Sequence, residues 1–234
     1  PNGAYPHYRA EVGKDRVLAQ NSVYLIDSGG QYPFGTTDIT RTLWIGPDAA
    51  PQSIKENFTR VLKGNIALSR VRFPPGTTGH SLDTLARAAL WEIGLDYDHG
   101  TGHGIGSYLS VHEGPQNISP APRPTALEAG MIVSNEPGYY EPGAYGIRIE
   151  NLMLVKPFSY QGAKGVFLEF EILSYTPIDR ELIDVTLLDD AELEWINAYH
   201  ADVLTRVGPV VEPDVQEWLE KVCAPMMRET TGIQ

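Results

Sequence analysis

The chain has almost no cysteine and is poor in basic residues. Its one cysteine, Cys223, excludes any disulfide within the 234 residues, which predicts a reducing, cytoplasmic location. Lys and Arg number 18 against 30 Asp and Glu, giving a formal net charge of −12. Nucleic acids and anionic membranes require clustered positive charge, but the densest basic stretch, Arg60 to Arg72, is spaced like one helix face. Neither partner is therefore expected.

Long hydrophobic runs are also missing. No apolar stretch approaches the roughly 18–20 residues of a membrane-spanning helix. Hydrophobic residues nevertheless make up 42% of the chain, an ordinary share for a globular protein. The first residues, PNGAYPHYRA, contain no Met and no apolar signal segment, and they are typical of the middle of a domain. We therefore expect the N-terminal part of this domain to be missing.

The hydrophobic pattern predicts a mixed α+β chain. Segments 17–27 and 36–46 are expected to form a strand hairpin joined by the turn-rich SGGQYPFG. Apolar residues at helical spacing predict a helix over about 51–70 and a second helix capped by Ser81 that stops at Gly94. The other expected elements are strands at Met131–Asn135, Ile147–Val155 and Phe167–Tyr175, a helix capped by Asp189 or Asp190 that runs to Val207, and a helix over 214–223.

Four acidic residues lie in strand-like apolar segments, where an uncompensated negative charge is costly. Asp27 ends the first strand and Asp38 interrupts the second. Glu136 follows the apolar run MIVSN, and Glu150 lies inside GIRIENLMLV. Each acid alone could pair with an arginine or cap a turn. Four of them, with HGTGH between them in the sequence, favour a bound cation instead.

The available ligand types limit which metal could bind. Carboxylates and imidazoles, with only one cysteine in the chain, form an oxygen-rich site with room for two divalent ions rather than a structural zinc site. Ligands of this softness favour Mn, Co, Fe or Zn over Cu. In paired-metal sites the ions clamp a substrate oxygen and generate hydroxide at neutral pH. His80 and His200 are expected at the surface or at helix caps.

Four segments resemble the catalytic domain of the Xaa-Pro aminopeptidases (aminopeptidase P), which are pita-bread metallopeptidases like prolidase and methionine aminopeptidase. The segments are YLIDSGGQYPFGTTDITRT, HGTGHGIGSYLSVHEGP, VSNEPGYY and GIRIENL. The resemblance implies an α+β pita-bread fold with a curved, mostly antiparallel sheet. The tail, with LEWINAYH, resembles the C-terminal extension of the three-domain members. This implies a catalytic domain over 1–185, incomplete at its N-terminus, a helical extension over 186–234, and further N-terminal domains in the same protein.

The resemblance also implies a set of metal ligands. Asp27 resembles a ligand of one metal. Asp38 and Glu150 resemble the carboxylates that bridge both metals. His103 and Glu136 resemble the remaining ligands of the second metal. The family implies two divalent ions, with manganese favoured and cobalt, zinc or iron as alternatives.

Catalytic and substrate-binding residues follow from the same resemblance. His99 and His112 resemble the histidines that hold substrate and stabilise the tetrahedral intermediate, and His7 resembles a histidine on the substrate side. Glu136 is expected to shuttle a proton near the attacking hydroxide. Arg148 resembles a partner that orients a ligand carboxylate, and it is grouped with the substrate-binding residues.

The implied activity is the removal of the N-terminal residue from peptides that carry proline second. Prolidase activity on free Xaa-Pro dipeptides is the nearest alternative, because it uses the same five ligands. The tail and GHGIGSYLSVHEGP favour the aminopeptidase. A non-catalytic binding module and a creatinase-like hydrolase without metal are less favoured, because the ligand set is intact. The tail helices suit either a homodimer or packing on their own domain.

Overall fold

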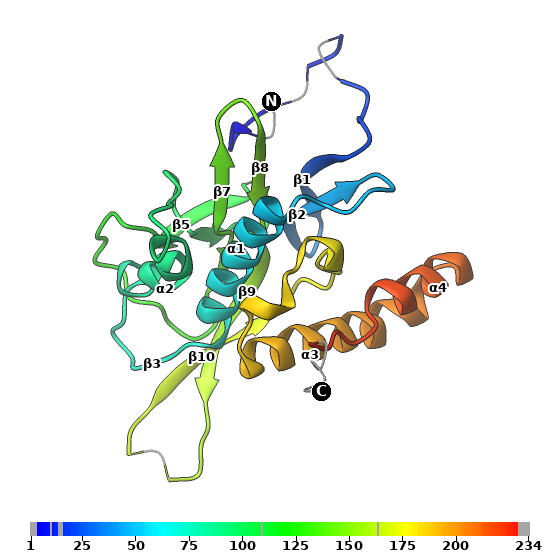
Figure 1. Cartoon of the computed structure of the whole chain (residues 1–234). Coiled ribbons are helices and arrows are strands. Elements are labelled where there is room, and N and C mark those ends of the chain that lie inside the picture. Colours follow the sequence, from blue (N-terminus) through cyan, green and yellow to red (C-terminus); the bar gives the residue numbers. More distant parts are fainter. Residues whose placement is uncertain (1–3, 10, 14–15, 109, 163, 229–234) are drawn as a thin grey trace, which may run out of the picture.

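The fold is α+β, as expected, with antiparallel strands, two central helices and a helical C-terminal region (Figure 1). The structure, a computed structural model, describes residues 4–9, 11–13, 16–108, 110–162 and 164–228. Its strands are β1 (Ser22–Tyr32), β2 (Gly35–Ile45), β3 (Arg72–Phe73), β4 (Gly102–Ile105), β5 (His112–Ile118), β6 (Ile132–Asn135), β7 (Gly138–Glu141), β8 (Tyr145–Arg148), β9 (Asn151–Phe158) and β10 (Phe167–Ile172). Its helices are α1 (Gln52–Arg70), α2 (Gly79–Trp91), α3 (Asp190–Val207) and α4 (Pro213–Val222), with short 3₁₀ turns η2 (Arg180–Leu182), η3 (Val185–Leu187) and η4 (Gly208–Val210).

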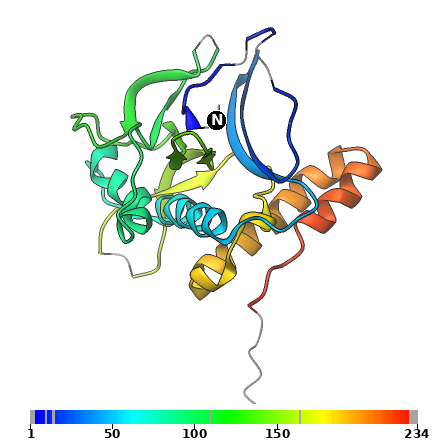
Figure 2. The same ribbon diagram turned by 45° about the horizontal axis from the view of Figure 1, so that its top comes forward.

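The strands form one large sheet and two hairpins. The large sheet has the order β3-β10-β9-β6-β4-β5, and every neighbouring pair in it is antiparallel. Strands β1 and β2 form one separate hairpin, and β7 and β8 form the other. Figure 2 shows the β1–β2 hairpin as a curved ribbon that stands apart from the large sheet. The predicted antiparallel architecture is therefore confirmed.

The first hairpin is longer and tighter than predicted. The expected turn segment SGGQYPFG is mostly strand, because β1 continues to Tyr32 and β2 starts at Gly35. Asp27 therefore lies in mid-strand opposite Thr40, not at a strand end. The reason is a close approach of the two strands: an added Cβ at Gly29 would lie 2.9 Å from the Thr37 carbonyl oxygen. The glycines in this segment permit the close strand pairing, whereas the sequence pattern predicted a turn there.

The segment predicted as one strand, Ile147–Val155, is two strands that belong to different sheets. β8 pairs with β7, whereas β9 pairs with β6 and β10. The chain turns between them at Ile149 and Glu150, where the Glu150 N–H donates to the Thr40 carbonyl of β2 (3.1 Å). This sheet-switching corner brings the first hairpin against the large sheet.

Helices α1 and α2 cross closely. Gly64 lies at the crossing, since an added Cβ there would collide with the main chain of Ala86. Helix α2 begins at Gly79 with Thr78 as its N-cap, so the predicted cap at Ser81 was wrong. Gly79 packs so closely on the Asn117 carbonyl of β5 that only glycine fits there. The helix therefore starts two residues before Ser81, ahead of the apolar stripe from which its start was predicted. Gly94 has a φ of +75°, which agrees with the predicted helix stop.

The C-terminal helices have the predicted boundaries to within a residue or two. Asp189 caps α3 through a capping box with Glu192, and α4 begins at Pro213. Ile196 and Val203 of α3 are fully buried in the same hydrophobic cluster as Phe58 of α1. The extension thus shares a core with the rest of the chain, and the division at 185/186 stays a prediction. Within the described residues, no helix is long and apolar enough to cross a membrane.

Candidate metal centre

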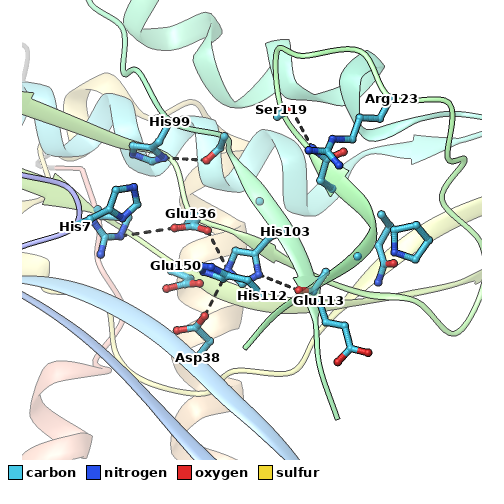
Figure 3. A pocket seen from close by; sticks show the side chains of 18 of the residues that line it. His7, Asp38, His99, His103, His112, Glu113, Ser119, Arg123, Glu136 and Glu150 are labelled. Atoms are coloured by element: carbon cyan, nitrogen blue, oxygen red, sulfur yellow. Dashed lines mark hydrogen bonds and ion pairs between the residues drawn. The ribbon is translucent and has the colours of Figure 1, made fainter. Parts of the chain in front are cut away.

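A cavity of about 450 Å³ lies between the β1–β2 hairpin, strands β4 and β5, and the corner after β8. Every residue that the sequence assigned to the site lines this cavity. The nine residues are His7, Asp27, Asp38, His99, His103, His112, Glu136, Arg148 and Glu150. Figure 3 shows Asp38, His103, Glu136 and Glu150 pointing toward one another at its centre. The structure therefore brings together side chains from segments up to 143 residues apart.

The hairpin register places two of the acids side by side. Asp27 lies opposite Thr40, and Asp38 is two residues before Thr40 on β2. The two acids are therefore diagonal neighbours on one face of the hairpin. Asp38 is 8% exposed, whereas the Asp27 side chain is 52% exposed. The hairpin thus contributes one buried and one accessible carboxylate.

The other two acids are held by main-chain and hydroxyl contacts. Glu136 follows β6, where its N–H donates to the Thr101 carbonyl (2.8 Å) and its Oε1 accepts from the Ser134 hydroxyl (3.1 Å). Glu150 is 1% exposed, and its Oε2 accepts from the Thr40 hydroxyl (2.7 Å). Its Oε1 is buried without a hydrogen-bond partner among the described residues. A buried acceptor without a partner fits a bound cation.

The candidate ligand atoms fall into three overlapping groups, and within each group they lie within 4.8 Å of one another. Asp38, His103 and Glu150 each belong to two of these groups, and of the three only the carboxylates of Asp38 and Glu150 have two oxygens to offer to a pair of ions. This sharing is the arrangement that a bridging carboxylate requires. The three groups are Asp27–Asp38–Glu150, His103–Glu136–Glu150 and Asp38–His103–His112.

His103 presents one ring nitrogen to the acids. Its Nε2 lies 3.5 Å from Asp38 and 3.3 Å from Glu136. Its Nδ1 lies 3.0 Å from the Gly104 carbonyl oxygen, which suits a protonated Nδ1 and leaves Nε2 as the ligand atom. Burial lowers its pKa, but the hydrogen bond to Asp38 and the charge of Glu136 outweigh burial, so the pKa is raised overall.

The crowded acids carry raised pKa values. Burial raises the pKa of Glu136 to about 7. Burial, together with the charges of Glu136 and Asp38, raises the pKa of Glu150 well above its ordinary value. Negative charge at this density needs compensation, which two divalent ions would supply. The donor set, the unpartnered Glu150 oxygen and the shared carboxylates all fit such a pair.

Arg148 lies directly against this cluster. It is 3% exposed, and its Nη2 donates to Asp27 (2.7 Å) while its Nε donates to the Thr40 hydroxyl (3.2 Å). Its Nη1 donates to the Tyr140 hydroxyl (3.0 Å). Arg148 thus contacts the Asp27 carboxylate, and its role as the partner of a metal ligand stays a prediction. Thr40 and Tyr140 were not among the predicted site residues, although Thr40 shares the face of Asp38 at period two.

The remaining histidines surround the cluster. His99 Nε2 hydrogen-bonds to the Tyr140 hydroxyl (2.9 Å), and burial lowers the pKa of His99 to about 4, so its ring is neutral. The His112 ring lies 3.9 Å from the His103 ring, centroid to centroid. The His7 ring lies 6.5 Å from that of His99. His112 thus lies beside His103 and shares a candidate ligand group with Asp38 and His103, which the sequence did not indicate.

Comparison with known proteins identifies the family. A model of metallopeptidase family M24 matches residues 1–157, and one of the C-terminal region of these peptidases matches residues 166–226. The chain belongs to metallopeptidase family M24. It is 49% identical over 233 residues to aminopeptidase P2 of Arabidopsis thaliana, an alignment that covers 97% of this chain and 32% of that protein. It thus spans about a third of the length of this curated relative.

Solved structures of relatives share the fold. The X-prolyl aminopeptidase of Caenorhabditis elegans, described as a cytosolic enzyme with a di-nuclear active site, is 43% identical with a TM-score of 0.90. That match covers 96% of this chain and 37% of the worm chain. The prolidase of Pyrococcus furiosus is 30% identical with a TM-score of 0.58, covering 72% of this chain and 45% of the prolidase. The pita-bread fold and the resemblance to Xaa-Pro aminopeptidases are both confirmed.

Proposed function

We propose that this chain carries the active site of a dinuclear metal-dependent aminopeptidase that removes the N-terminal residue from peptides with proline second. The observation that carries the proposal is the sharing of Asp38 and Glu150 between candidate ligand groups inside one cavity. Membership of a metallopeptidase family and likeness to proteins named aminopeptidase P support it.

Five residues would hold the two ions, with manganese favoured and cobalt, zinc or iron as alternatives. When bound, the ions supply an activated water and polarise the scissile carbonyl. The holding residues are Asp27, Asp38, His103, Glu136 and Glu150.

The chain's own side chains then handle protons and charge. Glu136 takes the proton of the attacking water on its carboxylate, which the Ser134 hydroxyl holds in place at Oε1, and passes that proton to the nitrogen of the leaving peptide as the bond breaks. His112 donates a hydrogen bond to the oxygen where negative charge develops, a contribution of about 3 kcal/mol for one such donor. His99 and His7, which line the same cavity, would face the substrate. Arg148 keeps Asp27 oriented through its 2.7 Å contact.

The selectivity for proline can be tested with matched peptides. The full-length protein, loaded with Mn²⁺, should release the first residue of an Xaa-Pro-Yaa peptide and leave the Xaa-Ala-Yaa counterpart intact. Equal cleavage of the two peptides would contradict the proposed substrate class.

Prolidase activity is the alternative from the same family. The TM-score of 0.90 to the worm X-prolyl aminopeptidase against 0.58 to the archaeal prolidase supports the aminopeptidase, as does the match of the C-terminal region. Turnover of an Xaa-Pro dipeptide and of a longer Xaa-Pro peptide should be compared at equal concentration. We expect the longer peptide to be cleaved efficiently, and a clear preference for the dipeptide would favour prolidase.

The setting of the protein is part of the proposal. The cytosolic nature of the worm relative supports a cytoplasmic location. A homodimer would suit the apolar side chains that α4 exposes, among them Trp218, which is 52% exposed. Sedimentation velocity of the full-length protein should then show a species of twice the monomer mass.

A further inference from the structure

Arg41 is a buried cation next to the candidate metal centre. It lies on β2, three residues after Asp38, and is 4% exposed. Among the described residues no carboxylate forms an ion pair with it. Burying a charge without a counter-ion is costly unless every donor is satisfied. The position therefore depends on the groups that receive its hydrogen bonds.

All the acceptors of Arg41 are neutral oxygens, and they come from separate parts of the chain. Within β2, Nη1 donates to the Thr40 carbonyl (2.8 Å). At the corner between β8 and β9, Nη1 also donates to the Glu150 carbonyl (2.5 Å) and Nη2 to the Asn151 side chain (2.8 Å). In the segment before α3, Nη2 donates to the Thr176 carbonyl (2.8 Å) and Nε to that of Pro177 (3.0 Å). On α3 itself, Nη2 donates to the Tyr199 hydroxyl (2.8 Å).

The corner that carries Glu150 is consequently held from both sides. The Glu150 N–H donates to the Thr40 carbonyl (3.1 Å), and the Glu150 carbonyl accepts from Arg41. The Oε2 atom of Glu150 accepts from the Thr40 hydroxyl (2.7 Å). Arg41 thus fixes the main chain of one shared carboxylate, while its own strand carries the other, Asp38. A planar guanidinium with its donors in a fixed fork is suited to this role, whereas an ammonium is not.

Tyr199 connects this arrangement to the C-terminal extension. It is 4% exposed and lies flat on Trp195 of the same helix, with 5.4 Å between ring centroids. Its hydroxyl accepts from Arg41 and from the Thr176 N–H (3.2 Å), and lies 2.8 Å from the Thr176 carbonyl oxygen. Loss of this one oxygen would leave Nη2 of Arg41 with only the Asn151 side chain and the Thr176 carbonyl, and would leave the Thr176 N–H without this acceptor, while the ring packing stays undisturbed.

We propose that Arg41 and Tyr199 are positioning residues through which helix α3 of the C-terminal extension fixes the shared carboxylates of the metal centre. The proposal rests on the ligand assignment made for the proposed function. It gives the extension a role at the site although no residue of α3 or α4 lines the cavity. Groups that orient ligands typically change metal affinity by about 10- to 100-fold when removed.

The test is a Tyr199→Phe substitution in the full-length protein, which removes only the hydroxyl. The metal-free protein is titrated with Mn²⁺ by calorimetry, and turnover of an Xaa-Pro peptide is measured at saturating Mn²⁺. We expect the Kd for Mn²⁺ to rise about tenfold, with kcat near wild type once metal is saturating. A Kd within twofold of wild type would overturn the proposal.

Tyr175→Phe is the matched control. It also removes a tyrosine hydroxyl, one that donates to the Ile172 carbonyl (2.8 Å), and it lies outside the contacts of Arg41. Its Kd for Mn²⁺ should stay at the wild-type value. Equal weakening by both substitutions would mean a general loss of stability, which would also overturn the proposal.

Arg41→Lys adds a second variant that keeps the charge and loses the fork. Its Kd should rise at least as much as that of Tyr199→Phe, and if the variant does not fold, Tyr199→Phe decides alone. The titration needs no turnover. A protein that binds Mn²⁺ with these shifts but cleaves no Xaa-Pro peptide would contradict the proposed activity and leave the positioning role established.

Discussion

At the residue scale, two buried acids, Asp38 on the β1–β2 hairpin and Glu150 at the corner after β8, each belong to two candidate ligand groups. Asp38 is 8% exposed and Glu150 is 1% exposed, so bulk water solvates neither carboxylate. Asp27, with more than half of its side chain exposed, is already paired with Arg148 at 2.7 Å. The shared acids should therefore control metal loading more strongly than Asp27 does.

Asp38→Ala and Glu150→Ala should each abolish metal loading and activity, because each removes a carboxylate common to two groups. Metal content per chain is measured by mass spectrometry after equilibrium dialysis against Mn²⁺. Glu128→Ala, which removes an exposed acid outside the cavity, should bind as wild type does. Retention of both ions by either of the first two variants would refute the bridging assignment.

His112→Ala distinguishes a catalytic donor from a ligand. Its ring lies 3.9 Å from the His103 ring and also faces the cavity. As a hydrogen-bond donor to developing charge, its loss should lower kcat about 100-fold. Metal content should stay near wild type. A parallel loss of metal would instead place His112 among the ligands.

At the element scale, local patterns predicted most helices and strands and the pairing of the first hairpin, but not how segments far apart in the sequence pair. The capping residue Asp189 and the period of the apolar residues located α3 correctly. The break between β8 and β9 was missed, because it depends on a hydrogen bond from Glu150 to Thr40, 110 residues away. Strands of glycine-rich sequence were also missed, since glycine marks both a turn and a close approach of two backbones.

His200 shows the same limit. It was expected at the surface or a helix cap, yet it is fully buried, and its Nε2 accepts from the Ile178 N–H (3.1 Å). Burial, and after it the charge of Arg41, lowers the pKa of His200 to about 4. The position of His200 in the helical pattern could not show that the face of α3 carrying His200 packs against the segment before η2.

The low pKa of His200 makes folding stability depend on pH. The unfolded chain binds a proton near pH 6.5, whereas the folded chain does so only near pH 4. The stabilising effect is therefore present above pH 6.5 and is lost as pH falls toward 4, by up to about 3 kcal/mol. Urea unfolding between pH 4 and 7 should be less pH-dependent in His200→Gln, which keeps an acceptor for Ile178. Identical pH profiles would contradict this.

At the scale of the whole molecule, the sequence predicted which segments meet at the cavity, and the roles of the individual residues stay predictions. All nine assigned residues line one cavity, because each lies inside a motif whose spacing the family resemblance fixed. The contribution of the C-terminal extension could not be predicted, since Arg41 reaches Tyr199 across 158 residues. The net charge of −12 is partly local, because four of the acids converge at the candidate metal centre.

The central claim is a paired-metal site that is required for cleavage of Xaa-Pro peptides. The most direct measurement is titration of the metal-free full-length protein with Mn²⁺, following bound metal and peptide cleavage in the same samples. We predict no cleavage without metal and full activity when two ions are bound per chain. Undiminished cleavage after removal of the metal, or saturation of binding and activity at one ion per chain, would contradict the account.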